Sequence, residues 1–208
     1  MDKIFKIVVI LLVIGLIIVL INDIYINMKM KELAAKGKST LKTGPIQQKI
    51  KEETIEIKGV KIKKLAKYDI TGIVIAKEYY YFGGGPNKIS KEDLTLCWGP
   101  AAEHKDDIYV LITGNDRFVN YRISGELYRQ YGEDAQNYIS NNHIIPINST
   151  INKIIKKAKK GDTIQMTGYL VYCQGDNWTW GPSSMVRTDK GNGACEIFLV
   201  ENARIIKK

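Results

Sequence analysis

The chain has 208 residues, of which 45% are hydrophobic and 25% are charged. This composition excludes a disordered chain, and the length allows one domain of ordinary size with accessory segments. The net charge is +9, but residues 1–50 alone carry eight lysines against three acids. Residues 51–208 hold 23 basic and 19 acidic side chains, a small excess that argues against a nucleic-acid partner.

The N-terminal apolar run is the clearest signal in the sequence. Residues 4–21 read IFKIVVILLVIGLIIVLI and contain one charge, Lys6. A helix rises about 1.5 Å per residue, so such a run can cross about 30 Å of hydrocarbon. A signal peptidase needs small residues just after the run, whereas this chain continues with INDI. We therefore predict an uncleaved single-pass transmembrane anchor over residues 4–22, preceded by a cytoplasmic tail at residues 1–3.

The charges that flank the run set its expected orientation. Lys3, Lys6 and the amino terminus favour a cytoplasmic N-terminus, although five lysines follow the run on its far side. The positive charges closest to the bilayer belong to the short tail, and Asp23 lies just after the apolar segment. We expect the body of the protein to lie outside the cytoplasm.

A stalk and then a β-rich domain are expected after the anchor. Residues 23–53 are polar and lysine-rich, which predicts a linker, helical at first, before a globular domain over residues 54–208. Residues 54–65 alternate polar and apolar side chains, and residues 68–82 are rich in β-branched and aromatic ones, as strands are. Residues 163–173 form a strand whose central glycine predicts a bulge. Further strands are expected in DIYVLITG, RFVNYRI, NWTW and ACEIFLVENARII.

Helices are expected between these strands. Residues 90–99 (SKEDLTLCWG) predict a short helix capped by Ser90, with acids in its first turn. Residues 125–139 are helical in pattern and lead into a loop over residues 140–146. Residues 151–160 predict an amphipathic helix, whose lysines form either a solvated face or a surface for anionic lipid or an acidic partner. The expected fold is α+β, an OB-like bent β-barrel with two or three inserted helices, preceded by one transmembrane helix.

The segment SSMVRTDKGNGACEIFLV, residues 183–200, combines several reactive residue types. A hydrolase would use Ser184 or Cys195 as nucleophile and His143 as base. The segment lacks the G-x-S-x-G elbow that exposes a nucleophilic serine, and His143 lies in no recognisable motif. A loop histidine and two serines at a turn explain the same residues without catalysis.

Metal and disulfide interpretations apply to the same segment. Asp189, Asn192 and Glu196 are oxygen ligands among glycines, but a calcium loop needs a different spacing, and no cysteine–histidine spacing suits zinc. We expect no metal and no cofactor. Cys173 and Cys195 would face each other in an antiparallel pairing centred on Ser184, which makes them candidates for a disulfide if the compartment is oxidising; two buried free thiols are the alternative.

A binding surface is the other hypothesis for this segment. Arg187 and Asp189 face the same way along a strand, and Glu196 joins them across a hairpin. We expect a polar network that fixes the loop and borders a binding surface. Trp178 and Trp180 either stack a ligand in an OB groove or pack the hairpin.

Several motifs occur in order along the chain: Cys97-Trp98-Gly99, NNHIIP, GDTIQMTGYLV and W-x-x-SS-x-x-R-x-D-x-G-x-GACE. Together they resemble a group of bacterial proteins that have an N-terminal anchor, one domain and this closing hairpin, over roughly residues 68–201. The resemblance transfers no catalytic or binding role to any residue of this chain. The chain departs from the pattern at Lys190, where the group has Thr, and at Cys97, where it has a small residue, so neither is expected to perform chemistry.

These observations predict a membrane-tethered, non-catalytic binding or assembly module at the bacterial cell envelope. Its expected location is the inner (cytoplasmic) membrane, with the globular domain extracytoplasmic. Its expected partner is another envelope protein, and the sequence identifies no small-molecule ligand. The alternative is the envelope hydrolase with Ser184 or Cys195 and His143.

Overall fold

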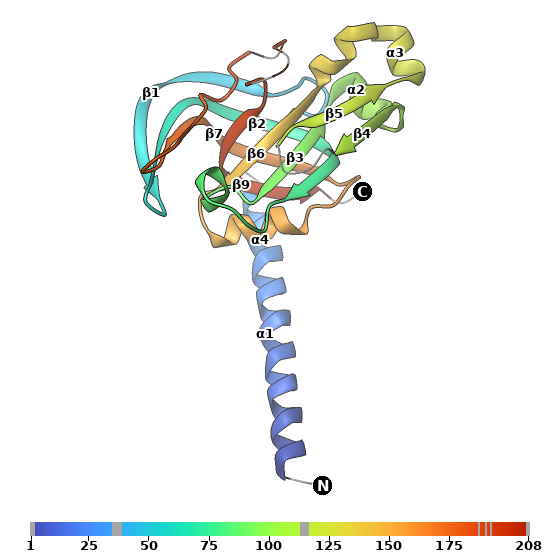
Figure 1. Ribbon diagram of the computed structural model, residues 1–208. Coiled ribbons are helices and arrows are strands. Elements are labelled where there is room, and N and C mark those ends of the chain that lie inside the picture. Colours follow the sequence, from blue (N-terminus) through green and yellow to red (C-terminus); the bar gives the residue numbers. More distant parts are fainter. Residues whose placement is uncertain are drawn as a thin grey trace. The chain divides into compact units, whose positions relative to one another are not determined.

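The computed structural model describes residues 3–34, 39–112, 117–186, 188–189, 191 and 193–206. The chain divides into two compact units, Met1–Gly37 and Lys38–Lys208, each described here by itself. The first unit is a helix and the second is rich in strands (Figure 1).

The first unit is the helix α1 (Lys3–Ala34). Its segment Phe5–Ile26, 22 residues long, is long and apolar enough to cross a bilayer. Large side chains along it are exposed, for example Leu11 at 62% and Leu12 at 69%, so they bury no core of their own. The helix continues past residue 22 because MKMKELA consists of good helix formers, which confirms the expected helical start of the stalk.

The second unit is built on a sheet whose strands, among the described residues, follow the order β1-β2-β3-β6-β9-β7-β8. The first part of β2 also pairs with β7, so β2, β3, β6, β9 and β7 form a closed ring of paired strands (Figure 1). Within this ring β6 and β9 are parallel, and the other pairs are antiparallel. The strands are β1 (Ile46–Ile57), β2 (Val60–Tyr79), β3 (Glu92–Cys97), β6 (Ile139–Pro146), β7 (Thr163–Gln174), β8 (Thr179–Trp180) and β9 (Glu196–Ile206).

The remaining elements are inserted between these strands, which makes the unit α+β. The hairpin β4 (Ile108–Ile112) and β5 (Val119–Ile123) forms a separate two-stranded sheet. Short helices flank this hairpin, and α4 connects β6 to β7. The helical elements are η1 (Gly85–Lys88), α2 (Gly99–Glu103), η2 (Lys105–Asp107), α3 (Gly125–Tyr131), η4 (Gly132–Tyr138) and α4 (Ser149–Lys157).

Buried aliphatic side chains of the ring strands form the main core. Ile62 of β2, Ile145 of β6 and Leu199 of β9 belong to one buried cluster. A second cluster joins Ile75 and Cys97 to the inserted helices. Each fully buried side chain of this size stabilises the fold by about 1.5–3 kcal/mol. The helices therefore extend the core of the sheet.

Two segments differ from their expected structure. Residues 92–97 form strand β3 and not the expected helix, because every one of them is buried between neighbouring strands. Residues 139–146 form strand β6 and not a loop, because the run is buried almost throughout and pairs on both sides. The start of the domain also differs, since the expected boundary at residue 54 lies inside β1, which pairs with β2 from Ile46.

The bulge expected in residues 163–173 is confirmed. The pairing of β7 with β9 shifts register between Thr167 and Gly168. A Cβ atom at Gly168 would overlap the carbonyl oxygen of Leu199 on β9. The glycine thus lets the backbones of β7 and β9 approach each other closely.

Replacing Gly168 with Ala will therefore destabilise the β-rich unit. We expect Gly168→Ala to lower the free energy of unfolding by about 3 kcal/mol, because the added methyl group has to displace a backbone carbonyl. Tryptophan fluorescence during denaturant unfolding of the full chain in detergent measures this. The control is Gly84→Ala, where an added Cβ meets nothing within 4 Å. Equal stability of the two variants would contradict the close approach.

Candidate functional site

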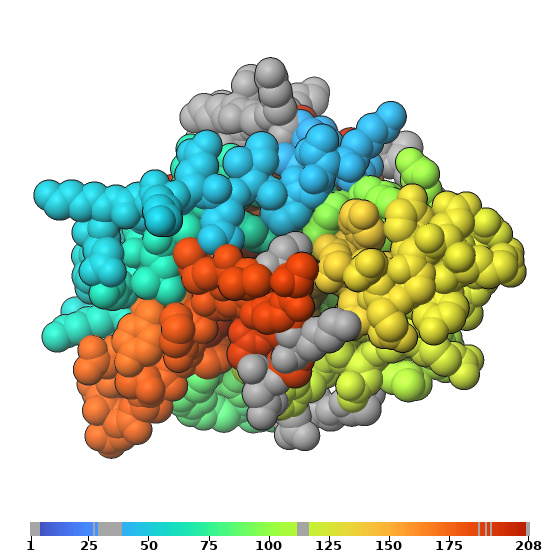
Figure 2. Space-filling model, turned by 90° about the horizontal axis from the view of Figure 1, so that it is seen from above, coloured from blue at the N-terminus to red at the C-terminus, as the bar shows by residue number. Residues whose placement is uncertain are grey.

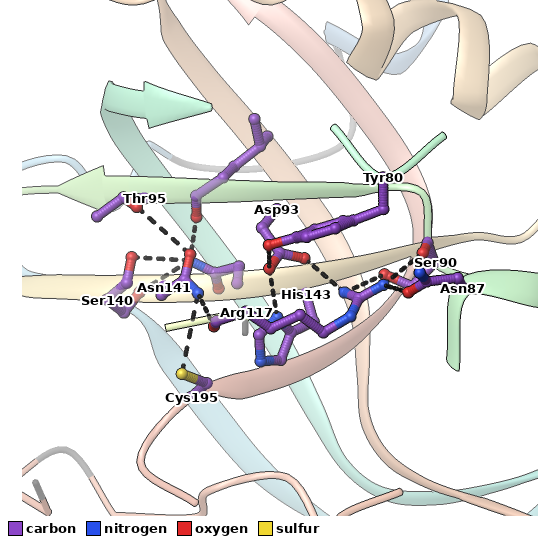
Figure 3. A network of polar contacts seen from close by, with 12 residues as sticks. Tyr80, Asn87, Ser90, Asp93, Thr95, Arg117, Ser140, Asn141, His143 and Cys195 are labelled. Carbon is purple, nitrogen blue, oxygen red and sulfur yellow. Dashed lines mark hydrogen bonds and ion pairs between the residues drawn. The ribbon is translucent and has the colours of Figure 1, made fainter. Parts of the chain in front are cut away.

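A buried carboxylate, Asp93 on β3, organises a polar cluster (Figure 3). Tyr80 donates its hydroxyl to Asp93 Oδ2 at 2.9 Å, and Arg117 donates Nη1 to Oδ1 at 2.9 Å. His143 Nδ1 lies 2.8 Å from Oδ2. With its side chain 1% exposed, Asp93 carries a charge that these three groups compensate. We call Tyr80, Asp93, Arg117, His143 and Trp180 the Asp93 cluster.

Arg117 ties the Asp93 cluster to the loop between β2 and β3. Its Nη2 donates to Asn87 Oδ1 at 2.5 Å and to the carbonyl oxygen of Ser90 at 2.7 Å. The guanidinium also lies over two rings, 4.1 Å from the centroid of Tyr80 and 5.0 Å from that of Trp180. Burial lowers the pKa of Arg117, while the charge of Asp93 acts in the opposite direction. The pair is thus a cation and an anion held together inside the protein.

His143 is positioned by β6 and not by a loop. In the antiparallel pairing of β3 with β6, His143 lies directly opposite Asp93. The 2.8 Å separation of Nδ1 from Asp93 Oδ2 is an ion-pair contact, which a protonated imidazole would strengthen. The ring centroid lies 5.1 Å from that of Trp180 on β8. The expectation of a loop histidine is wrong, because β6 is a buried strand.

The Asp93 cluster borders a cleft of about 640 Å³, which we call the Trp180 cleft. Its lining includes Arg117, Phe118, His143, Trp180, Met185 and Cys195. A second cleft of about 480 Å³, the Trp98 cleft, shares Ser184 and Met185 with it. Figure 2 shows the segment after β8 between β1 and the α3–η4 region, where residues of all three parts line the Trp98 cleft.

The two serines of the closing segment hold its backbone in place. Ser183 Oγ accepts a hydrogen bond from the backbone of Ile197 at 3.0 Å. Ser184 Oγ donates to Asp189 Oδ2 at 2.6 Å and accepts from the backbone N–H of Val186 at 3.2 Å. Asp189, which was expected to belong to a polar network, thus has Ser184 as a hydrogen-bond partner. Both hydroxyls have structural partners, although both serines line the same cleft as His143.

Cys195 lines the Trp180 cleft as a protonated thiol. Its Sγ lies 3.9 Å from Asn141 Nδ2, which donates to it. Burial raises the pKa of the Cys195 thiol to about 11, partly offset by the Asn141 hydrogen bond. At neutral pH the thiolate, which is the nucleophile, is scarce.

The candidate disulfide between Cys173 and Cys195 is not formed. All three cysteines lie among the described residues and are free. The antiparallel pairing of β7 with β9 is centred on residue 184 as expected, with Leu170 opposite Phe198. This pairing ends before it reaches the two cysteines, and Cys173 pairs with Trp180 of β8 instead.

The other expected binding residues lie in different places. Trp178 and Trp180 both pack against the core cluster of the ring strands, and Trp180 in addition belongs to the Asp93 cluster. Glu196 begins β9, is 2% exposed and lines the Trp98 cleft. Arg187 lies outside the described residues. The expected surface is thus divided between two clefts.

Two members of the Asp93 cluster were not anticipated: Asp93 and Arg117. Asp93 was assigned to the first turn of a helix, where a carboxylate needs no buried partner. One signal in the sequence does indicate that Asp93 is buried, since it directly precedes the mostly apolar stretch LTLC of the same strand. Among the described residues, no group of three or more His, Cys, Asp or Glu side chains has the arrangement to hold a metal ion.

The cluster has the carboxylate and imidazole that acid–base chemistry uses. In catalytic triads an aspartate orients the histidine by accepting from Nδ1, whereas Asp93 and His143 are in ion-pair contact. None of the hydrogen bonds described for Ser183, Ser184 and Cys195 joins them to this histidine. The arrangement therefore supports recognition in a cleft with aromatic and cationic walls more directly than it supports nucleophilic catalysis.

Removing the charge of Asp93 will strongly destabilise the β-rich unit. We expect Asp93→Asn to lower the free energy of unfolding by about 3–5 kcal/mol, because Arg117 stays buried without its anion. Denaturant titration of the full chain in detergent measures the change. Glu126→Gln, at the exposed ion pair with Arg129, is the control and should leave stability unchanged. If the Asp93→Asn protein is as stable as the control, the buried pair of Asp93 and Arg117 contributes little to the stability of the fold.

The raised pKa of Cys195 predicts slow alkylation at neutral pH. A thiol with a pKa of about 11 is far less ionised at pH 8 than an ordinary cysteine, so iodoacetamide should react with it slowly. Because the folded pKa is raised, the labelling rate should increase as the pH rises towards 11. Peptide mass spectrometry of the folded chain follows this rate, with a synthetic peptide of the same segment as reference. Labelling at the peptide's rate at pH 8 would contradict the raised pKa, and only labelling faster than the peptide would identify an activated thiol.

Comparison with known proteins gives this cluster no precedent. No family model, no curated protein and no solved structure matches the chain. The function therefore has to be inferred from the clefts, the cluster and the apolar helix.

Proposed function

We propose that the protein is a single-pass membrane protein of the bacterial envelope, whose β-rich unit is a non-catalytic binding module. The length and apolarity of Phe5–Ile26 support an anchor in the inner (cytoplasmic) membrane. Lys3 and Lys6 support a cytoplasmic N-terminus, which leaves the β-rich unit outside the cytoplasm.

We further propose that the ring of strands is an OB-like barrel. In an OB-fold, five strands close a bent Greek-key barrel. The ring here has the strand order β2-β3-β6-β9-β7, with closure between β7 and β2. Numbered along the ring strands alone, this is the order 1-2-3-5-4 with the third and fifth strands parallel. The helix α4 lies between the third and fourth strands in sequence.

The position of the Trp180 cleft carries the proposal of a binding module. OB-folds bind their ligands on the face of the second and third strands and on the adjoining loops. Here those strands are β3 and β6, which supply Asp93 and His143. The loop between the first two strands supplies Tyr80, and the segment between β7 and β9 supplies Trp180. This correspondence between the Asp93 cluster and the ligand-binding face of OB-folds supports the proposal.

Exposed apolar side chains at the Trp180 cleft favour a protein partner. Phe118 and Met185 line the cleft and are 44% and 40% exposed. Val186, which follows in the same segment, is 57% exposed. Aromatic side chains, methionine and arginine are enriched where proteins bind each other, and a cleft that accepts an apolar anchor provides most of the affinity. We infer an envelope protein that inserts an apolar side chain beside Trp180.

The pair Asp93–His143 favours one second candidate, an envelope hydrolase. In that mechanism His143 would be the base, and Ser184 or Cys195 would attack the substrate. The structural hydrogen bonds of Ser184 and the raised pKa of Cys195 count against it. A hydrolytic activity that is lost on His143→Ala and on Ser184→Ala or Cys195→Ala, in variants that stay folded, would favour this candidate over the binding module.

Photocrosslinking in intact membranes tests the binding module. A benzoylphenylalanine at Phe118 or Met185 should give the same discrete protein adduct, because both side chains border one cleft. The same probe at Tyr128, which is 47% exposed on α3, is the control and should not give that adduct. Trp180→Ala should reduce the adduct at least about tenfold, as expected for loss of a hot-spot aromatic residue.

Two results would contradict the proposal. If positions 118 and 128 give identical adducts, the Trp180 cleft is not the binding site. If alkaline carbonate releases the chain from membranes, α1 is not an anchor, and the location has to be revised whatever the crosslinks show.

A further inference from the structure

An exposed aromatic loop follows β2. Phe82 is 89% exposed and Tyr81 is 71% exposed, the two highest values for large hydrophobic residues described in the β-rich unit. The ring centroids of Tyr79 and Tyr81 are 4.4 Å apart, and those of Tyr81 and Phe82 are 6.4 Å apart. Asn87 Nδ2 donates to the carbonyl oxygen of Phe82 at 2.8 Å, which holds the loop backbone. These aromatic side chains are thus presented to the exterior by an ordered loop.

The helix α4 presents lysines beside this loop. Its isoleucines are buried, whereas its lysines face outward, and residues 149–160 contain five lysines and no acid. Lys156, Lys159 and Lys160 are exposed. Lys156 Nζ lies 5.4 Å from the ring centroid of Tyr79, so the loop and the helix form one continuous surface. We call Tyr81, Phe82, Lys156, Lys159 and Lys160 the α4 surface.

Lys77 fixes α4 in this position. Its Nζ donates to the carbonyl oxygens of Ile155, Lys156 and Ala158 at 3.0–3.2 Å, at the C-terminal end of the helix. The same Nζ lies 3.0 Å from the buried Glu92. Glu92 is therefore paired inside the protein. Asp162 accepts from the backbone N–H of Lys159 at 2.8 Å, so the surface combines the five lysines of residues 149–160 with one adjacent acid and is positive on balance.

We propose that the α4 surface binds anionic phospholipid headgroups of the membrane in which α1 is anchored. Lysine and exposed aromatic side chains together are typical of protein surfaces that lie in the headgroup region, where the rings enter the interface and the ammonium groups meet phosphates. An acidic protein surface would account for the lysines but not for Phe82, which is almost fully exposed. The proposal rests on the proposed membrane anchor.

The tether makes weak lipid contacts sufficient. The candidate span ends at Ile26, and the β-rich unit begins at Lys38, so few residues separate the unit from the bilayer. A short tether keeps the effective concentration of the lipid surface high, and each lysine near an anionic surface adds a small favourable contribution. Three lysines and two aromatic side chains then suffice to orient the unit on the membrane.

Lipid photocrosslinking of the full chain in nanodiscs tests this inference. A benzoylphenylalanine at Phe82 should form phospholipid adducts in discs of phosphatidylcholine mixed with phosphatidylglycerol. In phosphatidylcholine alone the adducts should be about tenfold fewer, because the lysines lose their anionic partners. Raising the salt concentration should reduce the adducts in the anionic discs.

Charge reversal provides the matched comparison. Lys156→Glu, Lys159→Glu and Lys160→Glu together should remove the anionic-lipid adducts at position 82, with a loss of about fivefold for each lysine. The control changes the net charge equally on the β1–β2 hairpin, through Lys51→Glu, Lys61→Glu and Lys67→Glu, and should keep the adducts. All variants should retain the unfolding transition of the unmodified chain.

Several outcomes would overturn the inference. Adducts of equal yield in both lipids, or equal loss in both charge variants, exclude specific binding of anionic lipid by the α4 surface. A protein adduct in cells with no lipid adduct assigns the surface to another occupant. A chain that remains in the disc but labels no lipid refutes this inference alone, whereas a chain that leaves the disc refutes the proposed anchor as well.

Discussion

The burial of the Asp93 carboxylate is the constraint on which the candidate site depends. An ionised carboxylate inside a protein requires partners, and the chain recruits them from three separate segments: Tyr80 after β2, Arg117 before β5 and His143 on β6. Arg117 then reaches back to Asn87 and the loop between β2 and β3. One charge thus fixes Arg117 and His143, which line the Trp180 cleft, and ties them to the loop between β2 and β3.

Local patterns in the sequence were sufficient for most strands, because alternation and β-branched residues act over a few neighbours. Val60–Tyr79 and the bulge at Gly168 were visible in this way. The strands β3 and β6 were missed, since their residues are buried on both faces and lose the alternation that marks a half-buried strand. Capping residues such as Ser90 then suggested a helix that the sheet overrides.

The candidate site was only partly predictable, for a related reason. Trp180, His143 and Cys195 were selected by residue type, and all three line one cleft. Arg117 and Asp93 are 24 residues apart, so their 2.9 Å contact depends on the closure of the sheet and not on any local spacing. The disulfide candidate shows the same dependence, because the β7–β9 pairing ends at Leu170 and Phe198, and β8 then pairs with Cys173.

The segment of residues 184 and 185 belongs to the lining of two clefts. Ser184 and Met185 line both the Trp180 cleft and the Trp98 cleft, and Gln47 on β1 donates to the carbonyl oxygen of Met185 at 3.3 Å. Substitutions in the two clefts therefore act on a common element. Their energetic effects are coupled through this shared segment.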